Sequence, residues 1–409
     1  MKGSRALGPI LLALATAEAG VRLLRPRKPV IAPEPVDLHT YFSDAEITRG
    51  RKYARPQLAL GLARTAVEGA ALARLVRRPP RWLSPTASVP PPLAGALGAA
   101  GLTTVLSIPP LPLSAISRRR AIKVGLVTQS WRGWALDLVK ANAIGAVMAG
   151  GAGAGLVAVT RRYPTTWWAP AAAGSVVVGS VLAAVAPVVL DPIFNDFTPL
   201  PDGETRSDVL ELARSAGVKV REVYSVDASR RTTAANAYVT GLGPTKRVVL
   251  FDTLLDRYSR EEVAVVVAHE LAHVQGRDVP RGVLYAALVA PAGAYAIQRL
   301  SWALSRERGS AAALPALAMA AALVSAPLGL VGNRLSRAME RRADQVSLEL
   351  TGASDAFVSF ERAIALQNVA DLDPPKWLTR VMATHPSTAD RIGAALGYAK
   401  TSGPEGPPL

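Results

Sequence analysis

The sequence has no cysteine among its 409 residues, and only four residues are histidine. The lack of cysteine excludes a disulfide scaffold, a cysteine nucleophile and a thiolate metal site. Charged residues are also scarce at 19%, aromatic residues make up 5%, and half of the residues are hydrophobic. With a mean hydropathy of +0.22, the chain is too apolar for an ordinary soluble enzyme or a disordered protein.

Seven segments are long and apolar enough for membrane-spanning helices, which need about 20 mostly apolar residues. They are residues 6–24, 56–76, 93–117, 141–160, 168–190, 283–304 and 311–331. The second segment contains Arg64, Glu68 and Arg74, and the first two of these can pair on one helix face. A soluble amphipathic helix is the alternative for this segment. The first segment follows Lys2 and Arg5 and ends in small residues, so a cleaved signal peptide is its alternative.

Two hydrophilic stretches, 191–281 and 332–409, separate or follow these segments. Five spans precede the first stretch and two more lie between it and the second, so both are on the same side of the membrane. They can therefore form one domain. We predict five spans in 1–190, two parts of one domain in 191–281 and 332–400, two spans in 282–331 and a disordered tail in 401–409.

The net charge of +16 and the pI near 10.5 are typical of a nucleic-acid-binding protein or of a membrane protein whose basic loops face anionic lipid. The loops at 22–55 and 117–140 hold 14 Lys and Arg, against 10 in the loops on the opposite side. This bias predicts a multi-pass protein of the cell membrane, with its N-terminus outside and its hydrophilic domain in the cytoplasm. Because no nucleic-acid-binding motif occurs, the predicted partner is the lipid bilayer and not nucleic acid.

The sequence HELAH, which begins at His269, is an HExxH motif with two histidines four residues apart on one helix face. Ser259 and Glu262 form a capping box ahead of an apolar run, which predicts a buried helix. His269 and His273 can bind one zinc ion through neutral imidazoles. Glu270 can then take a proton from water beside the metal. The alternative is a helix with two structural, hydrogen-bonded histidines.

A catalytic zinc ion usually has three protein ligands and one open position. The remaining histidines, His39 and His385, are candidates for the third ligand, and so is a carboxylate from a second helix. The best carboxylate is Glu340, just after the last apolar segment. Asp344 lies four residues later on the same helix face, where it can orient a ligand histidine. A charged surface helix, with neighbouring arginines as partners, is the alternative for this segment.

Two β-rich runs, 236–240 and 247–251, flank a Gly/Pro turn and predict a hairpin. In an endopeptidase, such a strand edge can bind an extended substrate as an additional strand; an ordinary hairpin is the alternative. His385 lies in a Thr-His-Pro-Ser sequence, with Arg391 six residues later. A histidine there can stabilise the oxyanion of a tetrahedral intermediate. The alternative is an ordinary His-Pro pair in a loop, without a catalytic role.

Together these motifs resemble the CAAX prenyl protease 1 family of integral-membrane zinc endopeptidases, over nearly the whole chain. The matching segments follow the family's order: residues 194–200, 227–230 with 236–238, the HELAH motif, Glu340 with Ala343 and Asp344, and 384–386. The segment 41–52 resembles the family more weakly. Seven spans also agree with the family, which favours an uncleaved first span.

The resemblance implies one zinc ion bound by His269, His273 and Glu340, with Glu270 as general base. Asp344 then contacts a ligand histidine and orients it, without binding the metal itself. The implied fold is mainly α, a polytopic membrane protein with about seven transmembrane helices and a zincin-like α+β metalloprotease domain. In the family, the helices enclose the site in a large chamber, with the zinc domain on the cytoplasmic side.

The resemblance also implies a substrate-binding segment. By position, Asn236 would hold the substrate backbone and His385 would stabilise the oxyanion. We expect Ala237, Tyr238 and Arg391 to take part in substrate binding. The substrate is a peptide or protein, lipidated or membrane-bound. Cleavage after a prenylated cysteine, quality control of membrane proteins as in the HtpX protease, and a non-enzymatic protein with a degenerate site remain as alternatives.

Overall fold

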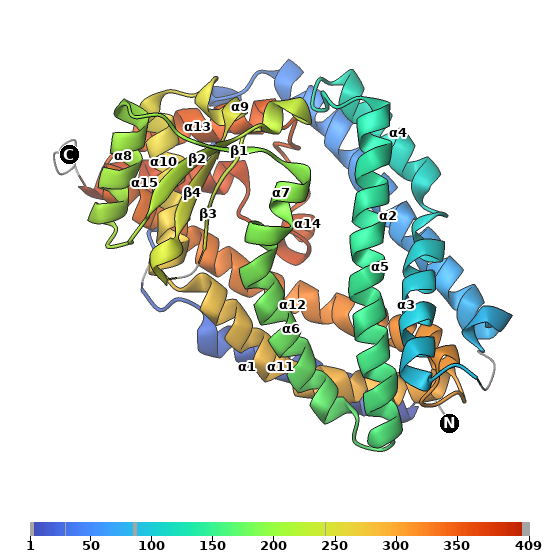
Figure 1. Cartoon of the computed structure of the whole chain (residues 1–409). Helices are drawn as coiled ribbons and strands as arrows, with labels where there is room; N and C mark the ends of the chain where they lie inside the picture. Colours follow the sequence, from blue (N-terminus) through green and yellow to red (C-terminus); the bar gives the residue numbers. More distant parts are fainter. Residues whose placement is uncertain (1–3, 29, 85–87, 242, 403–409) are drawn as a thin grey trace.

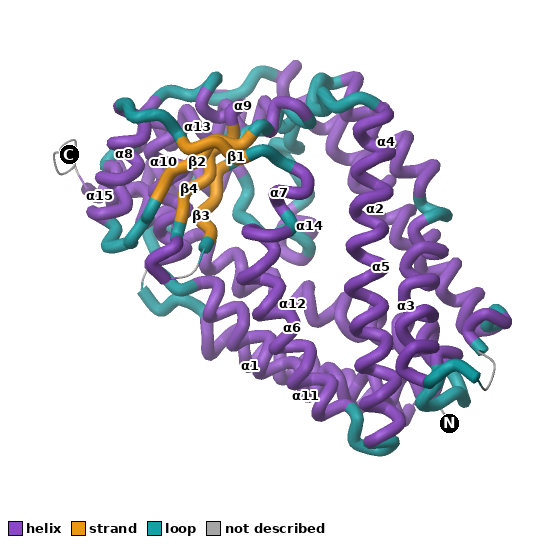
Figure 2. The backbone as a smooth tube through the Cα atoms, viewed as in Figure 1, coloured by secondary structure: helices purple, strands orange, loops and turns teal. Residues whose placement is uncertain are grey.

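The computed structural model describes residues 4–28, 30–84, 88–241 and 243–402, and most of them lie in helices (Figures 1 and 2). The helices are α1 Ser4–Leu24, α2 Asp44–Arg77, α3 Pro91–Ser107, α4 Leu111–Lys123, α5 Trp131–Arg162, α6 Trp168–Val189, α7 Asp191–Phe194, α8 Glu204–Ser215, α9 Asp252–Leu255, α10 Arg260–Gln275, α11 Asp278–Leu304, α12 Leu314–Thr351, α13 Ser354–Gln367, α14 Lys376–Val381 and α15 Thr388–Ser402. The strands are β1 Phe197–Pro199, β2 Glu222–Val226, β3 Ala237–Thr240 and β4 Arg247–Phe251.

Five helical segments among the described residues are long and apolar enough to cross a membrane. They are Ala6–Leu24, Trp131–Arg162, Trp168–Phe194, Asp278–Leu304 and Ala311–Thr351. These correspond to the first, fourth, fifth, sixth and seventh predicted spans. The third, 93–117, is divided into α3 and α4, which are bent by 51° and make a sixth span only if they are counted together. Pro109 and Pro110 lie at the break, where they cannot donate helical hydrogen bonds.

The second predicted span, 56–76, is not among these candidates, so the prediction of seven apolar spans exceeds the structure by one or two. It lies inside α2, which is continuous for 34 residues but is less apolar than the five segments above, with Arg64 and Glu68 in its middle. The predicted pair of Arg64 with Glu68 does not form between these two described residues, and Nε of Arg64 is buried without a hydrogen-bond partner. Helix α2 nevertheless packs against α3, α4 and α12.

Apolar side chains cover the outer surface of the long helices. On α6, Val177, Val178 and Val181 are more than half exposed, and on α5 Leu136 and Val139 are exposed by 63% and 68%. Exposed apolar surface of this extent is unfavourable in water. The exposure therefore agrees with helices that face lipid.

The first helix is part of the helical bundle. Helix α1 packs against α11 and α12, and Ala13 is fully buried in a cluster with Ala296 and Val324. This packing is expected of an uncleaved span and not of a removed leader. At the other end of the chain, α15 continues to Ser402, so residues 401 and 402 of the predicted tail are helical, and residues 403–409 lie outside the described residues.

A four-stranded sheet lies at one end of the molecule, with the helices of the C-terminal region around it (Figures 1 and 2). The strand order is β1-β2-β4-β3; β2 and β4 are parallel, and the outer strands pair antiparallel with them. The predicted hairpin is confirmed, because β3 pairs with β4 in the register Ala237 to Leu250. Strand β3 has no further neighbour among the described strands and forms an edge of the sheet.

The two hydrophilic stretches of the sequence share one hydrophobic core. Val223 and Leu250 of the sheet and Val267 and Leu271 of α10 are fully buried in the same cluster as Phe360 of α13. Ser347 of α12 also donates a hydrogen bond of 2.7 Å to a carbonyl of α10. Helices from before and after the last two spans therefore pack together and hold the site.

Candidate metal centre

Helix α10 carries both histidines of the HELAH motif. Ser259 and Glu262 form the capping box that the sequence predicts, with hydrogen bonds in both directions, and this fixes the start of the helix. The apolar run that follows is buried, including Val267 and Ala268. Because residues four apart share a helix face, His269 and His273 point the same way, toward α12.

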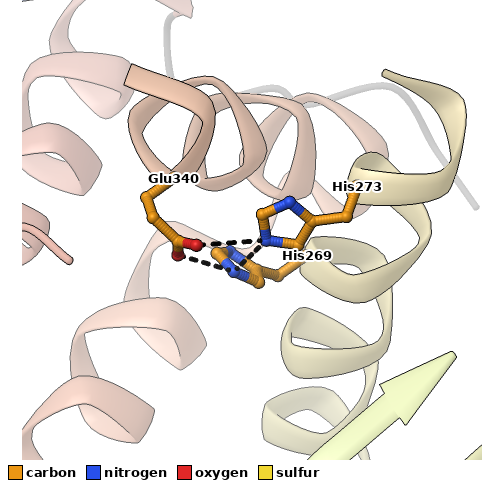
Figure 3. A group of neighbouring side chains, drawn as sticks. All are labelled: His269, His273 and Glu340. Atoms are coloured by element: carbon orange, nitrogen blue, oxygen red, sulfur yellow. Dashed lines mark hydrogen bonds and ion pairs between the residues drawn. The ribbon is translucent and has the colours of Figure 1, made fainter. Parts of the chain in front are cut away.

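Glu340 of α12 completes a cluster of three potential ligands (Figure 3). Nε2 of His269 lies 3.1 Å from Nε2 of His273. The Glu340 carboxylate lies 3.4 Å from Nε2 of His269 and 3.5 Å from Nε2 of His273. All three ligand atoms lie within 4.8 Å of one another, and the group can hold one metal ion. Among the described residues, this is the group of side chains that could hold a metal ion.

His269 is supported by a buried chain of charged residues. Oδ1 of Asp344 lies 2.9 Å from its Nδ1 atom. Asp344 also accepts hydrogen bonds from the Arg391 guanidinium, the shortest of them 2.6 Å. On its other side, Arg391 lies 2.5 Å from the carboxylate of Glu361 in α13. Asp344 and Glu361 are both only 2% exposed, so this chain lies in the core of the domain.

His273 is supported from a different direction. Its Nδ1 atom lies 2.8 Å from Oδ2 of Asp278, the first residue of α11. Arg342 of α12 donates a hydrogen bond of 2.9 Å to the same oxygen and one of 2.8 Å to the carbonyl of Ala272. A Cβ atom on Gly276 would lie 2.0 Å from the Arg342 guanidinium, so a larger residue here would displace this arginine from its present position. In both histidines, the Nδ1 atom faces a carboxylate, and the Nε2 atom faces the other potential ligands.

Burial and charge shift the titration of several groups around the site. Burial raises the pKa of the Glu361 carboxyl to about 7, although Arg391 opposes the shift. Burial would lower the pKa of Arg391, but the negative charges of Asp344 and Glu361 outweigh it and raise that pKa. Burial likewise acts to lower the pKa of His269, but hydrogen bonds to Asp344 and Glu340 raise it above its ordinary value.

Glu270 is the one carboxylate of the HELAH motif. It lies beside the ligand cluster on α10, and burial raises the pKa of its carboxyl above the ordinary value. No described residue hydrogen-bonds or ion-pairs with this carboxylate, in contrast to Asp344 and Asp278. Its oxygens are therefore available to water or substrate.

The residues predicted to contact substrate lie in two places. His385, in the loop between α14 and α15, has its Nε2 atom 3.5 Å from the Glu340 carboxylate, and its side chain is 64% exposed. Asn236 is exposed just before the edge strand β3, and its carbonyl accepts a hydrogen bond from Phe251. Tyr238 lies on β3, and its hydroxyl is 3.5 Å from Asp191.

Two predicted residues lie elsewhere than expected. His39, one candidate for the third ligand, pairs with Asp44 at 3.2 Å and is not part of the metal-binding group. Arg391, expected to contact substrate, is held between Asp344 and Glu361. The sequence did not predict that Asp278, Arg342 and Glu361 lie at the site. Asp278 alone had a local signal, because an acid five residues after a ligand histidine can reach it across the end of a helix.

Two family models together match most of the chain. Residues 199–399 match the model of peptidase family M48, and residues 30–196 match that of the CAAX prenyl protease N-terminal region, described as five membrane helices. The uncharacterised metalloprotease YhfN of Bacillus subtilis is 32% identical over 300 residues, which cover 71% of this chain and 70% of YhfN. The chain belongs to peptidase family M48. It is accordingly a metal-dependent peptidase with membrane-spanning helices.

Other M48 relatives carry the name CAAX prenyl protease 1. A probable CAAX prenyl protease 1 of Schizosaccharomyces pombe is 28% identical over 284 residues, which cover 66% of this chain and 59% of that protein. The human CAAX prenyl protease 1 homolog is 40% identical over 85 residues, 21% of this chain and 18% of its own. The crystal structure of S. mikatae Ste24p has the same fold, with a TM-score of 0.78 over 97% of this chain and 98% of Ste24p at 20% identity.

Proposed function

We propose that this M48 peptidase is a zinc-dependent endopeptidase whose metal is held by His269, His273 and Glu340. The observation that carries the proposal is the convergence of these three donors beside an unpartnered Glu270. Two imidazole nitrogens and one carboxylate oxygen, with an open position, are the donor set of catalytic zinc. When bound, zinc supplies Lewis acidity that polarises the scissile carbonyl.

The chain's own residues supply the remaining chemistry. Glu270 accepts a proton from the attacking water and passes it to the leaving amine. His385 lies next to Glu340 with an exposed ring, and it donates a hydrogen bond to the oxyanion of the tetrahedral intermediate. The open edge of β3 binds the substrate backbone as an additional strand, with Asn236, Ala237 and Tyr238 along that edge.

The substrate we propose is a protein with a prenylated cysteine near its C-terminus. This proposal is supported by the names of the M48 relatives in Schizosaccharomyces pombe and human. It is also supported by the candidate membrane helices that adjoin the domain, since a lipidated substrate enters from the bilayer. Quality-control cleavage of membrane proteins is the alternative that the same experiment separates.

The first test is product mass spectrometry on a farnesylated CAAX peptide with the detergent-purified, zinc-loaded chain. Wild type releases the last three residues, and Glu270→Gln loses at least about a hundredfold in rate, because the base is gone, while it keeps about one zinc per chain. Glu261→Gln, on the exposed side of the same helix, is the matched control and stays active. Full activity in Glu270→Gln would refute the mechanism. Cleavage of an unfolded membrane protein but not of the peptide would refute the prenyl substrate alone.

We also propose that the peptidase domain lies in the cytoplasm, on the side of the basic loops at 22–55 and 117–140. The absence of native cysteine makes this directly measurable with single cysteines. Asp355→Cys, on the exposed surface of α13, stays protected from an impermeant maleimide in intact cells and reacts after lysis. Arg81→Cys, in the loop after α2, reacts in intact cells. The reverse pattern would show the opposite orientation.

A further inference from the structure

A cluster of positive charges lies where α2 begins and α4 ends, away from the metal centre. Arg49 and Lys52 of α2 and Arg120 and Lys123 of α4 line one cavity of about 660 Å³. The lysines and Arg49 are exposed. Only one carboxylate, Asp44, lines the same cavity, and it pairs with His39. We call these four basic residues the basic pocket.

The basic pocket is held in shape by hydrogen bonds that cross between the two helices. Arg120 donates a hydrogen bond of 2.9 Å to the carbonyl of Lys52, and Arg49 donates one of 3.4 Å to the carbonyl of Val124. Each arginine thus contacts the backbone of the opposite helix, which fixes the distance between the two pairs of cations. Nε of Arg120 is buried and has no hydrogen-bond partner. The Arg120 residue as a whole is only partly buried and lines the cavity.

These cations differ from their neighbours on the same helix. Arg51 pairs with Asp373 at 3.2 Å, and Arg55 pairs with Asp371 at 2.8 Å. In the basic pocket, by contrast, no described carboxylate pairs with any of the four cations. A bias of basic residues that only sets orientation does not require that four of them converge on one cavity without a carboxylate partner.

We propose that the basic pocket binds the phosphate of an anionic phospholipid headgroup. Both helices belong to the region that matches a model of five membrane helices, and the pocket lies beside 93–117, the third predicted span. Ile116 and Ile122 of α4 are exposed by 50% and 37%, which gives an apolar surface for the acyl chains next to the cations. That combination favours a lipid over a soluble phosphate. The inference goes beyond the proposed peptidase function and does not rest on it.

The test is native mass spectrometry of the full chain in detergent with phosphatidylglycerol, and with phosphatidylcholine as the zwitterionic reference. The wild-type chain retains phosphatidylglycerol in preference to phosphatidylcholine. The variant Lys52→Gln/Arg120→Gln/Lys123→Gln loses affinity for it on the order of a hundredfold, from about fivefold per basic residue. Lys52→Gln/Lys123→Gln keeps the cross-helix hydrogen bonds of the arginines and loses about 30-fold on the same basis. This second variant tests the charges without disturbing the helix contact.

The matched control is Arg77→Gln/Arg78→Gln, which removes two exposed cations at the opposite end of α2 and retains phosphatidylglycerol as wild type does. Equal retention by the wild type and the double lysine variant would overturn the proposal. So would equal losses in the lysine variant and the control, since these indicate only general charge attraction. Displacement of the lipid by millimolar inorganic phosphate would overturn the lipid assignment and assign the pocket to a soluble phosphate.

Discussion

The two histidines that we propose as metal ligands lie one turn apart on α10, yet they are held from different regions of the molecule. His269 is supported through Asp344 by residues of α13 and α15, all inside the peptidase domain. His273 is supported by Asp278, the first residue of a candidate membrane span. The His269 side chain is 11% exposed and that of His273 is 24% exposed. One ligand is thus fixed by the domain core, and the other by the junction between domain and membrane.

The largest expected effect is on the core side of this comparison. Arg391→Met leaves Asp344 buried without its cation, which costs about 3–5 kcal/mol of unfolding free energy. The measurement is denaturant unfolding of the purified chain in detergent. Lys400→Met, on the same helix with a 67% exposed side chain, is the control and costs less than about 1 kcal/mol. A loss in Arg391→Met no larger than in the control would show that the buried chain does not stabilise the domain.

A second prediction concerns the pH dependence of the same region. The pKa of Glu361 is raised to about 7 from 4.5, so the folded state holds the proton more tightly than the unfolded state. Its contribution is therefore present below pH 4.5 and is lost as pH rises toward 7, by about 3 kcal/mol in all. Glu361→Gln should abolish this loss between pH 5 and pH 8. Glu211→Gln, on the exposed surface of α8, keeps the wild-type pH profile. A wild-type profile in Glu361→Gln would contradict the assignment.

The third prediction compares the two supports directly. Asp344→Asn lowers zinc affinity about 100-fold and Asp278→Asn about tenfold, the upper and lower ends of the range for residues that orient a ligand. The difference follows from the deeper burial of Asp344, whose side chain is 2% exposed against 8% for Asp278. Competition with a zinc chelator measures both, and Asp355→Asn is the surface control. Equal losses in the two variants would show that the two supports are equivalent.

Much of the candidate metal site could be predicted from the sequence, because the patterns that indicate it lie within single helices. The HELAH spacing, the capping box and the four-residue step from Glu340 to Asp344 each depend on a single helix, and the structure brings the two helices together as the sequence predicts. The β3–β4 hairpin was also predicted from adjacent segments. In each case the relevant residues lie within a few turns of one another, where helix and strand geometry leave little choice.

Other features depend on contacts between distant segments, which one sequence does not reveal. Arg391 looked like a substrate contact because its partner Glu361 lies on another helix, and nothing around Glu361 in the sequence predicts its burial. The break at Pro109 and Pro110 was hidden by the apolar residues on both sides of it. Hydropathy locates apolar segments well, but it does not show where a helix bends or which charged helix packs among the spans.

Helix α12 extends without interruption from a candidate membrane span to Glu340, the proposed metal ligand. It runs for 38 residues, about 57 Å at 1.5 Å per residue, from the apolar segment that begins near Ala311 to the ligand Glu340 and beyond. Membrane helices change their tilt when bilayer thickness changes, and a tilt of this helix displaces the Glu340 carboxylate relative to the histidines on α10. If Glu340 is a metal ligand, we expect the proposed coordination to depend on the thickness of the surrounding bilayer.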